Sequence, residues 1–365
     1  MAVHAHINTV PGGSTGGIMM GQHKALLAKG EDSYAFWGRG RAAEGEHEMR
    51  FATDFEVRID ALMTRLDDRA GFHSKAATLR LLCRLDEIKP DVIHLHNLHG
   101  YYLNVEMLFA WLVEHNCRVE WTLHDCWAFT GHCAYFTYAK CDGWKTGCGD
   151  CPQRRSYPAS ILVDNSAKNF EDKRRVFTSI SLDRMTLVSP SLWLKGLVEK
   201  SFLRDYSVQV RRNDIDRAVF KPTPSDFRER CGVGDRFMIL GVASPWTERK
   251  GLSDFVQLSI ELNPEKYAVV LIGLSAKQIK EIPSSIIGLE RTESKHELAE
   301  IYSAADLLFN PTLEDNYPTV NLEAEACGTP VVTYDTGGCP ETVALLESRV
   351  VGSLREATQL MQCKV

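Results

Sequence analysis

Short runs of β-branched residues alternate with helical patterns along most of the chain, and they do so in two series. The first series contains the candidate strands Val3–Val10, Val92–Leu95, Val119–Leu123, Thr186–Val188 and Ser207–Arg211. The second contains Met238–Val242, Ala268–Ile272, Leu307–Asn310 and Val331–Tyr334. Strand–helix alternation predicts parallel sheets that are covered by helices on both faces. We therefore expect an α/β protein with two Rossmann-like domains.

A polar segment that contains two prolines, Asn213–Pro224, separates the two series. We predict an N-terminal domain over residues 1–213 and a C-terminal domain over 214–365, and a chain of 365 residues is long enough for both. Because ligands bind at the carboxyl ends of parallel strands, we expect two facing domains with the active site in the cleft between them. Residues 126–160 interrupt the alternation with Cys, Gly, Pro and aromatic residues, and such long loops are usually functional or held by a metal.

The composition excludes several classes of protein. With 44% hydrophobic and 25% charged residues the chain is expected to fold, and a net charge of −6 gives no sign of nucleic-acid binding. We expect neither a signal peptide nor a membrane span, and hence a cytoplasmic protein with reduced cysteines. The first 213 residues carry 27 basic and 25 acidic side chains, against 15 and 23 in the rest. This asymmetry suits contact with anionic lipids at the inner face of the membrane, or it is a small fluctuation of charge.

An acidic pair stands in the second series, where Asp315 and Glu323 are separated by seven residues. A strand is expected before this pair, and a helix that begins near Pro318 is expected to carry Glu323. Carboxylates accept hydrogen bonds from the hydroxyls of a sugar or a ribose, and the helix N-terminus suits a diphosphate. Pro318 has no N–H, so Tyr317 and Thr319 onward would supply the donors. An ordinary strand–loop–helix unit with acids facing solvent has the same spacing.

This stretch resembles the E-x7-E signature of the family-four retaining glycosyltransferases, which have the GT-B fold. The run L-A-E-I-Y-S-A-A-D before it, and Gly337-Gly338 after it, are also similar to that family. The second glutamate of the signature falls on Glu323 and the first on Asp315, which is shorter by one methylene. The resemblance implies that Asp315 contacts the transferred sugar and that Glu323 binds the ribose. The neighbouring Glu314 is a substitute in a less suitable register.

A basic turn, Arg249-Lys250-Gly251, follows the first strand of the second series. Lys250 suits the neutralisation of a diphosphate, and the resemblance places a diphosphate-binding lysine here. The family's partner arginine falls on Val242 in this chain, and Arg249 is expected to replace it. A solvated basic turn is the alternative.

The first series offers a glycine-rich segment and several histidines. Gly16 and Gly17 match a family loop that approaches the donor diphosphate, although a flexible turn has the same composition. His94 and His96 fall on one face of a strand, where we prefer a lining of the acceptor site to a metal site. His124 ends the next strand, where it could hydrogen-bond a sugar hydroxyl with Asp125 fixing its orientation, or it could be an ordinary structural histidine. The resemblance implies that a histidine at this position reaches the donor sugar.

Four cysteines gather in the 126–160 segment: Cys133, Cys141, Cys148 and Cys151. They could form a structural zinc site, or they could pack as small reduced hydrophobes. No cofactor is expected to be required for catalysis. The phrases around His124 and Cys133 resemble the exopolysaccharide (colanic-acid-type) branch of the family.

These patterns predict a retaining glycosyltransferase that moves a sugar from a nucleoside-diphosphate sugar to a glycan or lipid-linked saccharide in exopolysaccharide assembly. The alternatives are a nucleotide-sugar epimerase or phosphorylase of the same fold, or a non-catalytic sugar-nucleotide-binding assembly subunit. The candidate catalytic residues are His124, Lys250 and Asp315. The candidate donor-binding residues are Gly16, Gly17, Arg249, Lys250, Asp315, Asn316, Tyr317, Thr319, Val320 and Glu323.

Overall fold

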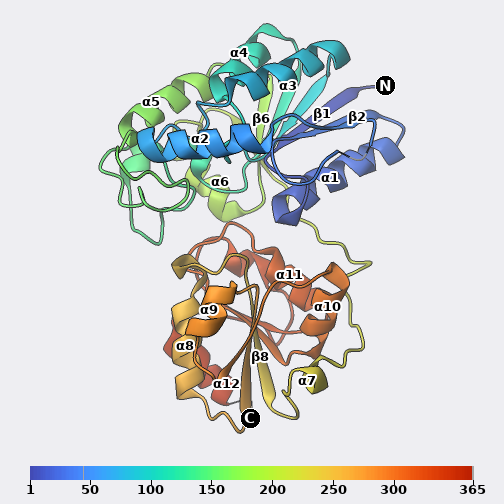
Figure 1. The fold of residues 1–365 in the computed structure, drawn as a ribbon, viewed down its shortest axis with the longest axis vertical. Helices are drawn as coiled ribbons and strands as arrows, with labels where there is room; N and C mark the ends of the chain where they lie inside the picture. Colours follow the sequence, from blue (N-terminus) through green and yellow to red (C-terminus); the bar gives the residue numbers. More distant parts are fainter. Residues whose placement is uncertain (44, 364–365) are drawn as a thin grey trace. The chain divides into compact units, whose positions relative to one another are not determined.

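The computed structural model describes residues 1–43 and 45–363. The chain divides into two compact units, Met1–Arg212 and Asn213–Val365. Each unit contains one fully parallel sheet, with helices on both faces of the sheet (Figure 1). The prediction of two Rossmann-like domains is therefore confirmed.

The N-terminal unit is built on a seven-stranded sheet with the order β3-β2-β1-β4-β5-β6-β7. Its strands are β1 (Val3–Asn8), β2 (Asp32–Trp37), β3 (Glu48–Arg50), β4 (Val92–Leu95), β5 (Arg118–Thr122), β6 (Met185–Ser189) and β7 (Ser207–Val210). Its α-helices are α1 (Gly13–Ala28), α2 (Asp54–Asp67), α3 (Lys75–Ile88), α4 (Val105–Glu114), α5 (Ser166–Phe177) and α6 (Leu192–Val198). Two short 3-10 helices, η1 (Trp127–Phe129) and η2 (Gly143–Lys145), lie in the segment between β5 and α5.

The C-terminal unit is built on a six-stranded sheet with the order β10-β9-β8-β11-β12-β13. Its strands are β8 (Phe237–Val242), β9 (Tyr267–Ile272), β10 (Ile286–Leu289), β11 (Leu307–Asn310), β12 (Val331–Tyr334) and β13 (Arg349–Val351). Its helices are α7 (Phe227–Arg230), η3 (Glu248–Lys250), α8 (Leu252–Glu261), α9 (Ala276–Glu281), α10 (Lys295–Ala304), α11 (Thr319–Ala326), η4 (Cys339–Thr342) and α12 (Leu354–Gln362).

The central strands explain why this sequence forms parallel sheets. All six residues of β9 and all four residues of β11 and β12 are buried, as expected for strands that are covered on both faces. The N-terminal unit has one main core, and the C-terminal unit has a core on each face of its sheet.

The order of strands reverses once in each sheet, which defines where a ligand site is expected. In the N-terminal sheet the reversal lies between β1 and β4, and in the C-terminal sheet between β8 and β11. In doubly wound sheets, ligands bind outside the carboxyl ends of the strands that flank this point.

Candidate functional site

The basic turn and the acidic loop of the C-terminal unit meet at its switch point. Lys250 lies in the connection after β8 and Asp315 in the loop after β11, and these are the two strands between which the strand order reverses. The Lys250 ammonium donates to Oδ2 of Asp315 at 2.5 Å. Arg249 lies close by, with a guanidinium nitrogen 3.6 Å from the same oxygen. The structure therefore brings three of the predicted donor-site residues together.

These charged side chains are sheltered from solvent. The side chains of Arg249, Lys250 and Asp315 are 15%, 21% and 16% exposed. Burial raises the pKa of the Asp315 carboxyl, but Lys250 and Arg249 outweigh burial, so the pKa lies below its usual value of 3.8. Asp315 is therefore ionised at neutral pH and lies against two cations. Cations that are fixed at this position suit the binding of an anionic group.

Backbone contacts hold the basic turn against the acidic loop. The backbone N–H of Leu313 donates to the carbonyl oxygen of Arg249 at 2.8 Å. Gly251 has a φ of +74°, and a Cβ there would lie 2.5 Å from the Pro311 carbonyl oxygen, so only glycine allows this close approach. The turn and the loop consequently form one preorganised surface.

Gly337 supports the same loop from the connection after β12. Its φ is +58°, and a Cβ would lie 2.1 Å from the carbonyl oxygen of Asp315. The N–H of Gly338 donates to that same carbonyl oxygen at 2.9 Å. The Gly337-Gly338 pair thus positions the backbone of the acidic loop.

Glu323 lies on α11, and its carboxylate accepts a hydrogen bond of 3.0 Å from the Tyr302 hydroxyl on α10. Burial raises the pKa of Glu323, against the lowering effect of hydrogen bonds from Tyr302 and Thr319. No role was predicted for Tyr302, which orients the acid. The only signal for it was its place in the L-A-E-I-Y-S-A-A-D run.

A buried chain of polar side chains fixes the start of α11. Asn310, at the end of β11, donates to the side-chain oxygen of Asn321 at 2.8 Å. Asn321 in turn donates to the Thr342 hydroxyl at 2.8 Å. All three side chains are buried, so the beginning of the helix is anchored to the sheet and to η4.

The remaining predicted donor residues surround the start of α11. Asn316 and Tyr317 are buried in the loop, whereas Thr319 and Val320 are partly exposed in the first turn. The neighbouring Glu314 is fully buried, and its carbonyl oxygen accepts from the Arg249 guanidinium, whereas Asp315 presents its carboxylate to Lys250.

In the N-terminal unit, the glycine-rich segment forms the beginning of α1. A Cβ on Gly16 would lie 2.6 Å from both the Pro11 carbonyl carbon and the Val10 carbonyl oxygen, so close packing alone explains this glycine. Gly17 is exposed, with no atom within 4 Å of the place of a Cβ, so packing does not explain this glycine. Donor contact by Gly16 and Gly17 stays a prediction.

The histidines after β4 and β5 also meet at the carboxyl edge of the N-terminal sheet. Nδ1 of His96 lies 3.1 Å from Nε2 of His124, with the rings stacked. Burial lowers the pKa of His124 to about 4, so the imidazole is neutral at pH 7. The expectation that Asp125 orients His124 is wrong. The Asp125 carboxylate instead contacts Nε2 of His99 at 2.8 Å and accepts from the Trp127 N–H at 2.9 Å.

The C-terminal unit matches a known family. Residues 236–361 match the model described as glycosyl transferases group 1. The C-terminal unit is a group 1 glycosyltransferase domain. This match confirms the resemblance that was based on the D-x7-E stretch.

The whole chain is similar to a curated protein and to solved structures. It is 25% identical to the putative colanic acid biosynthesis glycosyl transferase WcaC of Escherichia coli, over 96% of this chain and 87% of that protein. Sucrose-phosphate synthase from Thermosynechococcus elongatus has a TM-score of 0.72 at 14% identity and covers all of this chain and 89% of its own. Anabaena HepE in complex with UDP-glucose has a TM-score of 0.63 at 14% identity, with coverages of 100% and 90%. These likenesses show that the chain has the GT-B fold.

The cysteine-rich segment of the glycosyltransferase is packed into the N-terminal core. Phe129, Phe136 and Trp144 form a buried aromatic cluster. Lys173 on α5 is also buried, and its ammonium donates to the carbonyl oxygens of Trp127 and Thr130 at 2.9 and 3.0 Å. The segment is therefore a structural part of the domain as well as a connection.

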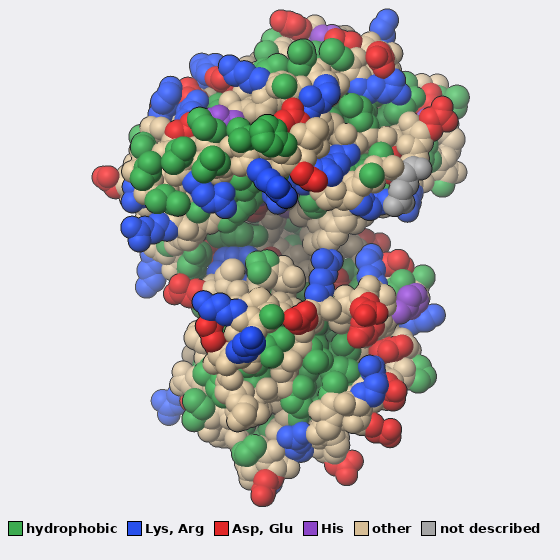
Figure 2. Space-filling model, in the orientation of Figure 1, with side chains coloured by type: hydrophobic (Ala, Val, Ile, Leu, Met, Phe, Trp, Pro, Cys, Tyr) green, Lys and Arg blue, Asp and Glu red, His purple; other side chains and the backbone are tan. Residues whose placement is uncertain are grey.

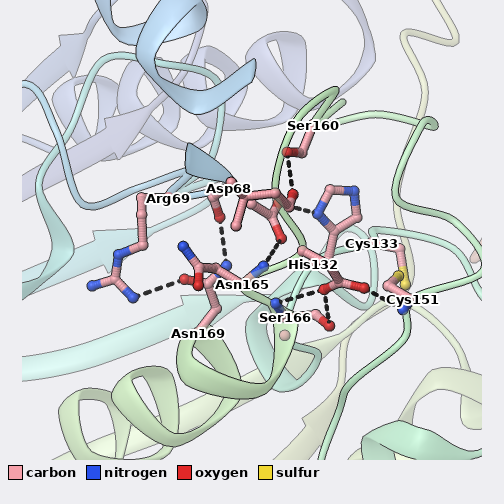
Figure 3. Close-up of polar contacts among 12 residues, drawn as sticks. Asp68, Arg69, His132, Cys133, Cys151, Ser160, Asn165, Ser166 and Asn169 are labelled. Carbon is pink, nitrogen blue, oxygen red and sulfur yellow. Dashed lines mark hydrogen bonds and ion pairs between the residues drawn. The ribbon is translucent and has the colours of Figure 1, made fainter. Parts of the chain in front are cut away.

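A buried ion pair holds this segment to the turn after α2 (Figure 3). Nδ1 of His132 contacts Oδ1 of Asp68, and both side chains are almost fully buried. Burial lowers the pKa of His132, but the contact with Asp68 outweighs it and raises the pKa above 6.5. Asp68 also accepts from the backbone N–H of Asn165 at 2.9 Å. The pair thus joins three segments that are distant in the sequence.

The four candidate zinc ligands line one small cavity beside His132, together with Trp144. Cys133 and Cys151 interact directly, and the hydrogen bond from Cys133 lowers the pKa of Cys151 to about 7. Within residues 1–43 and 45–363, no three Cys, His, Asp or Glu side chains are arranged to hold a metal ion. Zinc binding by Cys133, Cys141, Cys148 and Cys151 stays a prediction.

Within the same part of the chain, no helix is both long and apolar enough to cross a bilayer. Within the apolar segment Tyr101–Val113, the residues from Val105 onward belong to the ten-residue helix α4. Three of its large side chains, Leu108, Phe109 and Leu112, are buried in the core.

Proposed function

We propose that the chain transfers a sugar from a nucleoside-diphosphate sugar to a glycan or lipid-linked saccharide in the assembly of a cell-surface polysaccharide. The observation that carries this proposal is the arrangement of Lys250, Arg249 and Asp315 at the switch point of the group 1 domain. Support for the polysaccharide class comes from the similarity to the Escherichia coli colanic acid protein over 96% of the chain. Support for the donor class comes from the likeness in fold to HepE in complex with UDP-glucose.

In this proposal the donor diphosphate binds beside Lys250 and Arg249, with the open backbone at the start of α11 supplying further N–H donors. Positive charge that is fixed before the reaction lowers the free energy of a transition state in which negative charge grows on the leaving diphosphate. Asp315, which lies against Lys250, accepts hydrogen bonds from the sugar. Glu323, oriented by Tyr302, accepts from the ribose hydroxyls.

We further propose that the reaction retains the anomeric configuration. The acceptor hydroxyl oxygen forms a bond to the anomeric carbon on the same face from which the diphosphate oxygen departs. The proton of the acceptor moves to the departing phosphate oxygen, so no side chain has to act as the nucleophile. His124 is neutral at pH 7 and would hydrogen-bond the sugar rather than neutralise charge.

The test of this function is the variant Lys250→Ala with a panel of nucleoside-diphosphate sugars. We expect kcat to fall by a factor of about 100 to 1,000, because one charge-stabilising donor is removed from the leaving group. Lys277→Ala is the matched control, because Lys277 is 82% exposed on α9 and pairs with Glu281 of the same helix at 3.6 Å. Turnover of Lys250→Ala at the wild-type rate would refute the proposed role of the basic turn.

The same assay tests the stereochemistry and the reaction class. Proton NMR of the product is expected to show the anomeric configuration of the donor. An isomerised nucleotide sugar formed without an acceptor would indicate an epimerase, and a sugar phosphate formed with inorganic phosphate would indicate a phosphorylase. Selective binding of a donor without any transfer would indicate a non-catalytic binding subunit.

A further inference from the structure

Helix α2 of the N-terminal unit is amphipathic, but its apolar side faces solvent. Two polar side chains point inward, where Asp60 and Thr64 are buried. The exposed large side chains follow one another at helical spacing: Phe55 (72% exposed), Ile59, Leu62 (52%), Met63 and Leu66. A surface helix ordinarily has the opposite arrangement, with its apolar stripe against the core.

Hydrogen bonds show that the inward polar side of α2 is part of the fold. The Thr64 hydroxyl donates to Oδ1 of Asp60 at 3.2 Å, and the Ser74 hydroxyl donates to Oδ2 of Asp60. Burial raises the pKa of Asp60. A rotation of α2 that moved its apolar side chains inward would have to break the hydrogen bonds of Asp60 to Thr64 and Ser74. The outward direction of the apolar stripe is therefore imposed by the sequence.

A loop from the cysteine-rich region continues this apolar surface. The N–H of Ile161 donates to the carbonyl oxygen of Arg65, in the last turn of α2, at 2.8 Å. The loop is closed by a hydrogen bond of 2.6 Å from the Ser160 hydroxyl to the Val163 carbonyl oxygen. Ile161, Leu162 and Val163 are exposed, the first two at 59% and 65%. We call these three residues, with the five of α2, the apolar face.

Exposed apolar patches of this kind mark interaction surfaces. Figure 2 shows hydrophobic side chains gathered over the position of α2, with Lys and Arg side chains around them. Neither segment of the apolar face carries a residue of the proposed donor site.

The charges of α2 favour a negatively charged partner. Its acids have partners, since Asp54 pairs with Arg50, the partly buried Glu56 pairs with Arg80 at 2.5 Å, and Asp67 contacts His73 at 3.1 Å. Among the described residues of α2, Arg58 and Arg65 are exposed and form no ion pair, although Arg65 donates to the Ala61 carbonyl oxygen. These two positive charges lie beside the apolar stripe.

We propose that the apolar face, together with Arg58 and Arg65, binds the surface of an anionic phospholipid bilayer. An amphipathic helix that lies in the plane of a membrane inserts its apolar side below the headgroups, and flanking arginines attract anionic lipids. A second copy of the chain is the less favourable occupant. In a two-fold dimer the same surface meets itself, so the free arginines would face one another.

The test is co-sedimentation of the full chain with vesicles of phosphatidylcholine, with and without phosphatidylglycerol. We expect the wild type to sediment with the vesicles that contain phosphatidylglycerol, and we expect added salt to release it. The double variant Phe55→Ser, Leu62→Ser should bind about tenfold more weakly or worse, because buried methylene groups contribute much of the membrane affinity. Arg58→Gln with Arg65→Gln should remove the preference for phosphatidylglycerol.

The matched control is Ile260→Ser with Leu346→Ser, which removes from the C-terminal unit two apolar side chains that are at least as exposed. This control should bind vesicles as the wild type does. Wild-type binding by the Phe55→Ser, Leu62→Ser variant would overturn the proposal, as would failure of the wild type to sediment with either vesicle. Self-association of the wild type that the variant loses would assign the face to a second copy instead.

A separate measurement keeps this test independent of the proposed reaction. The Phe55→Ser, Leu62→Ser variant should keep the melting temperature of the wild type and its shift with nucleoside-diphosphate sugars, because the substituted side chains are exposed and lie outside the donor site. A chain that binds vesicles but no donor would contradict the proposed function and leave the membrane surface standing.

Discussion

At the scale of single residues, the donor site depends on side chains that orient the two acids. Asp315 is held by Lys250 at 2.5 Å and Glu323 by the Tyr302 hydroxyl at 3.0 Å. Each contact leaves part of the carboxylate available to accept hydrogen bonds from a substrate.

Removal of the Tyr302 hydroxyl should weaken donor binding. In Tyr302→Phe the carboxylate of Glu323 loses the hydrogen bond that fixes its direction, and hydrogen bonds to charged groups contribute about 1.5–3 kcal/mol. We expect KM for the nucleotide sugar to rise by about tenfold or more, with a smaller change in kcat, since the proposed contact is to the ribose and not to the reacting sugar. Tyr206→Phe is the control, because its hydroxyl binds a backbone oxygen in the N-terminal unit. A lower kcat at unchanged KM would contradict a role in ribose binding.

The buried pair of Asp68 and His132 should make stability depend on pH. The pKa of His132 is raised in the folded protein, so its contribution is fully present below about pH 6.5 and is lost as pH rises through the higher folded pKa. Asp68→Asn should cost about 3–5 kcal/mol, because one partner of a buried pair is removed. The difference between variant and wild type in urea unfolding should be largest below pH 6.5 and should shrink at alkaline pH.

The control for this pair is Asp86→Asn. Asp86 lies 3.3 Å from His115, but both side chains are about half exposed, so we expect a change below about 1 kcal/mol. Equal losses of stability in the two variants at every pH would show that the ion pair of His132 is not the cause.

At the scale of elements, most of the central strands were predictable and most of the edge strands were not. The strands Val92–Leu95, Leu307–Asn310 and Val331–Tyr334 have the predicted boundaries, because a short buried apolar run that is bounded by turn residues predicts a strand. The missed strands are β2, β3, β10 and β13. Three of them, β3, β10 and β13, are paired on one side only, and β3 and β13 contain three residues each. Such short edge strands have too few residues for a pattern, and pairing with a neighbour decides their conformation.

Helix α2 was also missed. Its large apolar side chains lie at helical spacing but face solvent, whereas Asp60 is buried in the fold. In the candidate site the sequence identified the charged residues that meet, but it could not identify their partners. Asp125 is adjacent to His124 in the sequence, yet its carboxylate contacts His99, which comes from the neighbouring strand connection. Such contacts depend on tertiary packing and leave no local signal.

The connection after β12 should control the acidic loop through one glycine. A Cβ at position 337 would lie 2.1 Å from the Asp315 carbonyl oxygen, so Gly337→Ala must displace the loop. We expect the affinity for nucleotide sugar, measured by calorimetry, to fall by at least about tenfold. Gly328→Ala is the control, because its φ of +87° is strained in the same way but its Cβ would only contact Pro222 at 3.7 Å. Equal loss of donor affinity in both variants would show that backbone strain alone is responsible.

At the scale of the whole molecule, each unit has its own hydrophobic core. The last buried residue in the core clusters of the N-terminal unit is Tyr206, and the first buried residue in those of the C-terminal unit is Phe220. No cluster therefore contains buried residues of both units. Because a domain with its own core can unfold as a separate cooperative unit, the equilibrium unfolding of the full chain is expected to show two transitions.

A nucleoside diphosphate without the sugar should stabilise these two transitions unequally. Most predicted contacts of its phosphates and ribose, among them Lys250, Arg249 and Glu323, belong to the C-terminal unit, whereas the N-terminal unit would contribute only Gly16 and Gly17. A ligand that binds only the folded form stabilises it by about 2.7 kcal/mol at 100 times its Kd. Scanning calorimetry with and without UDP, assisted by hydrogen exchange to assign each transition, should therefore show a larger upward shift for the C-terminal unit. If UDP instead raised mainly the transition of the N-terminal unit, the assignment of the nucleotide site to the C-terminal switch point would be wrong. In Lys250→Ala the shift of the C-terminal transition with UDP should be smaller, because one of the two cations that are proposed to bind the phosphates of UDP is removed while both cores stay intact.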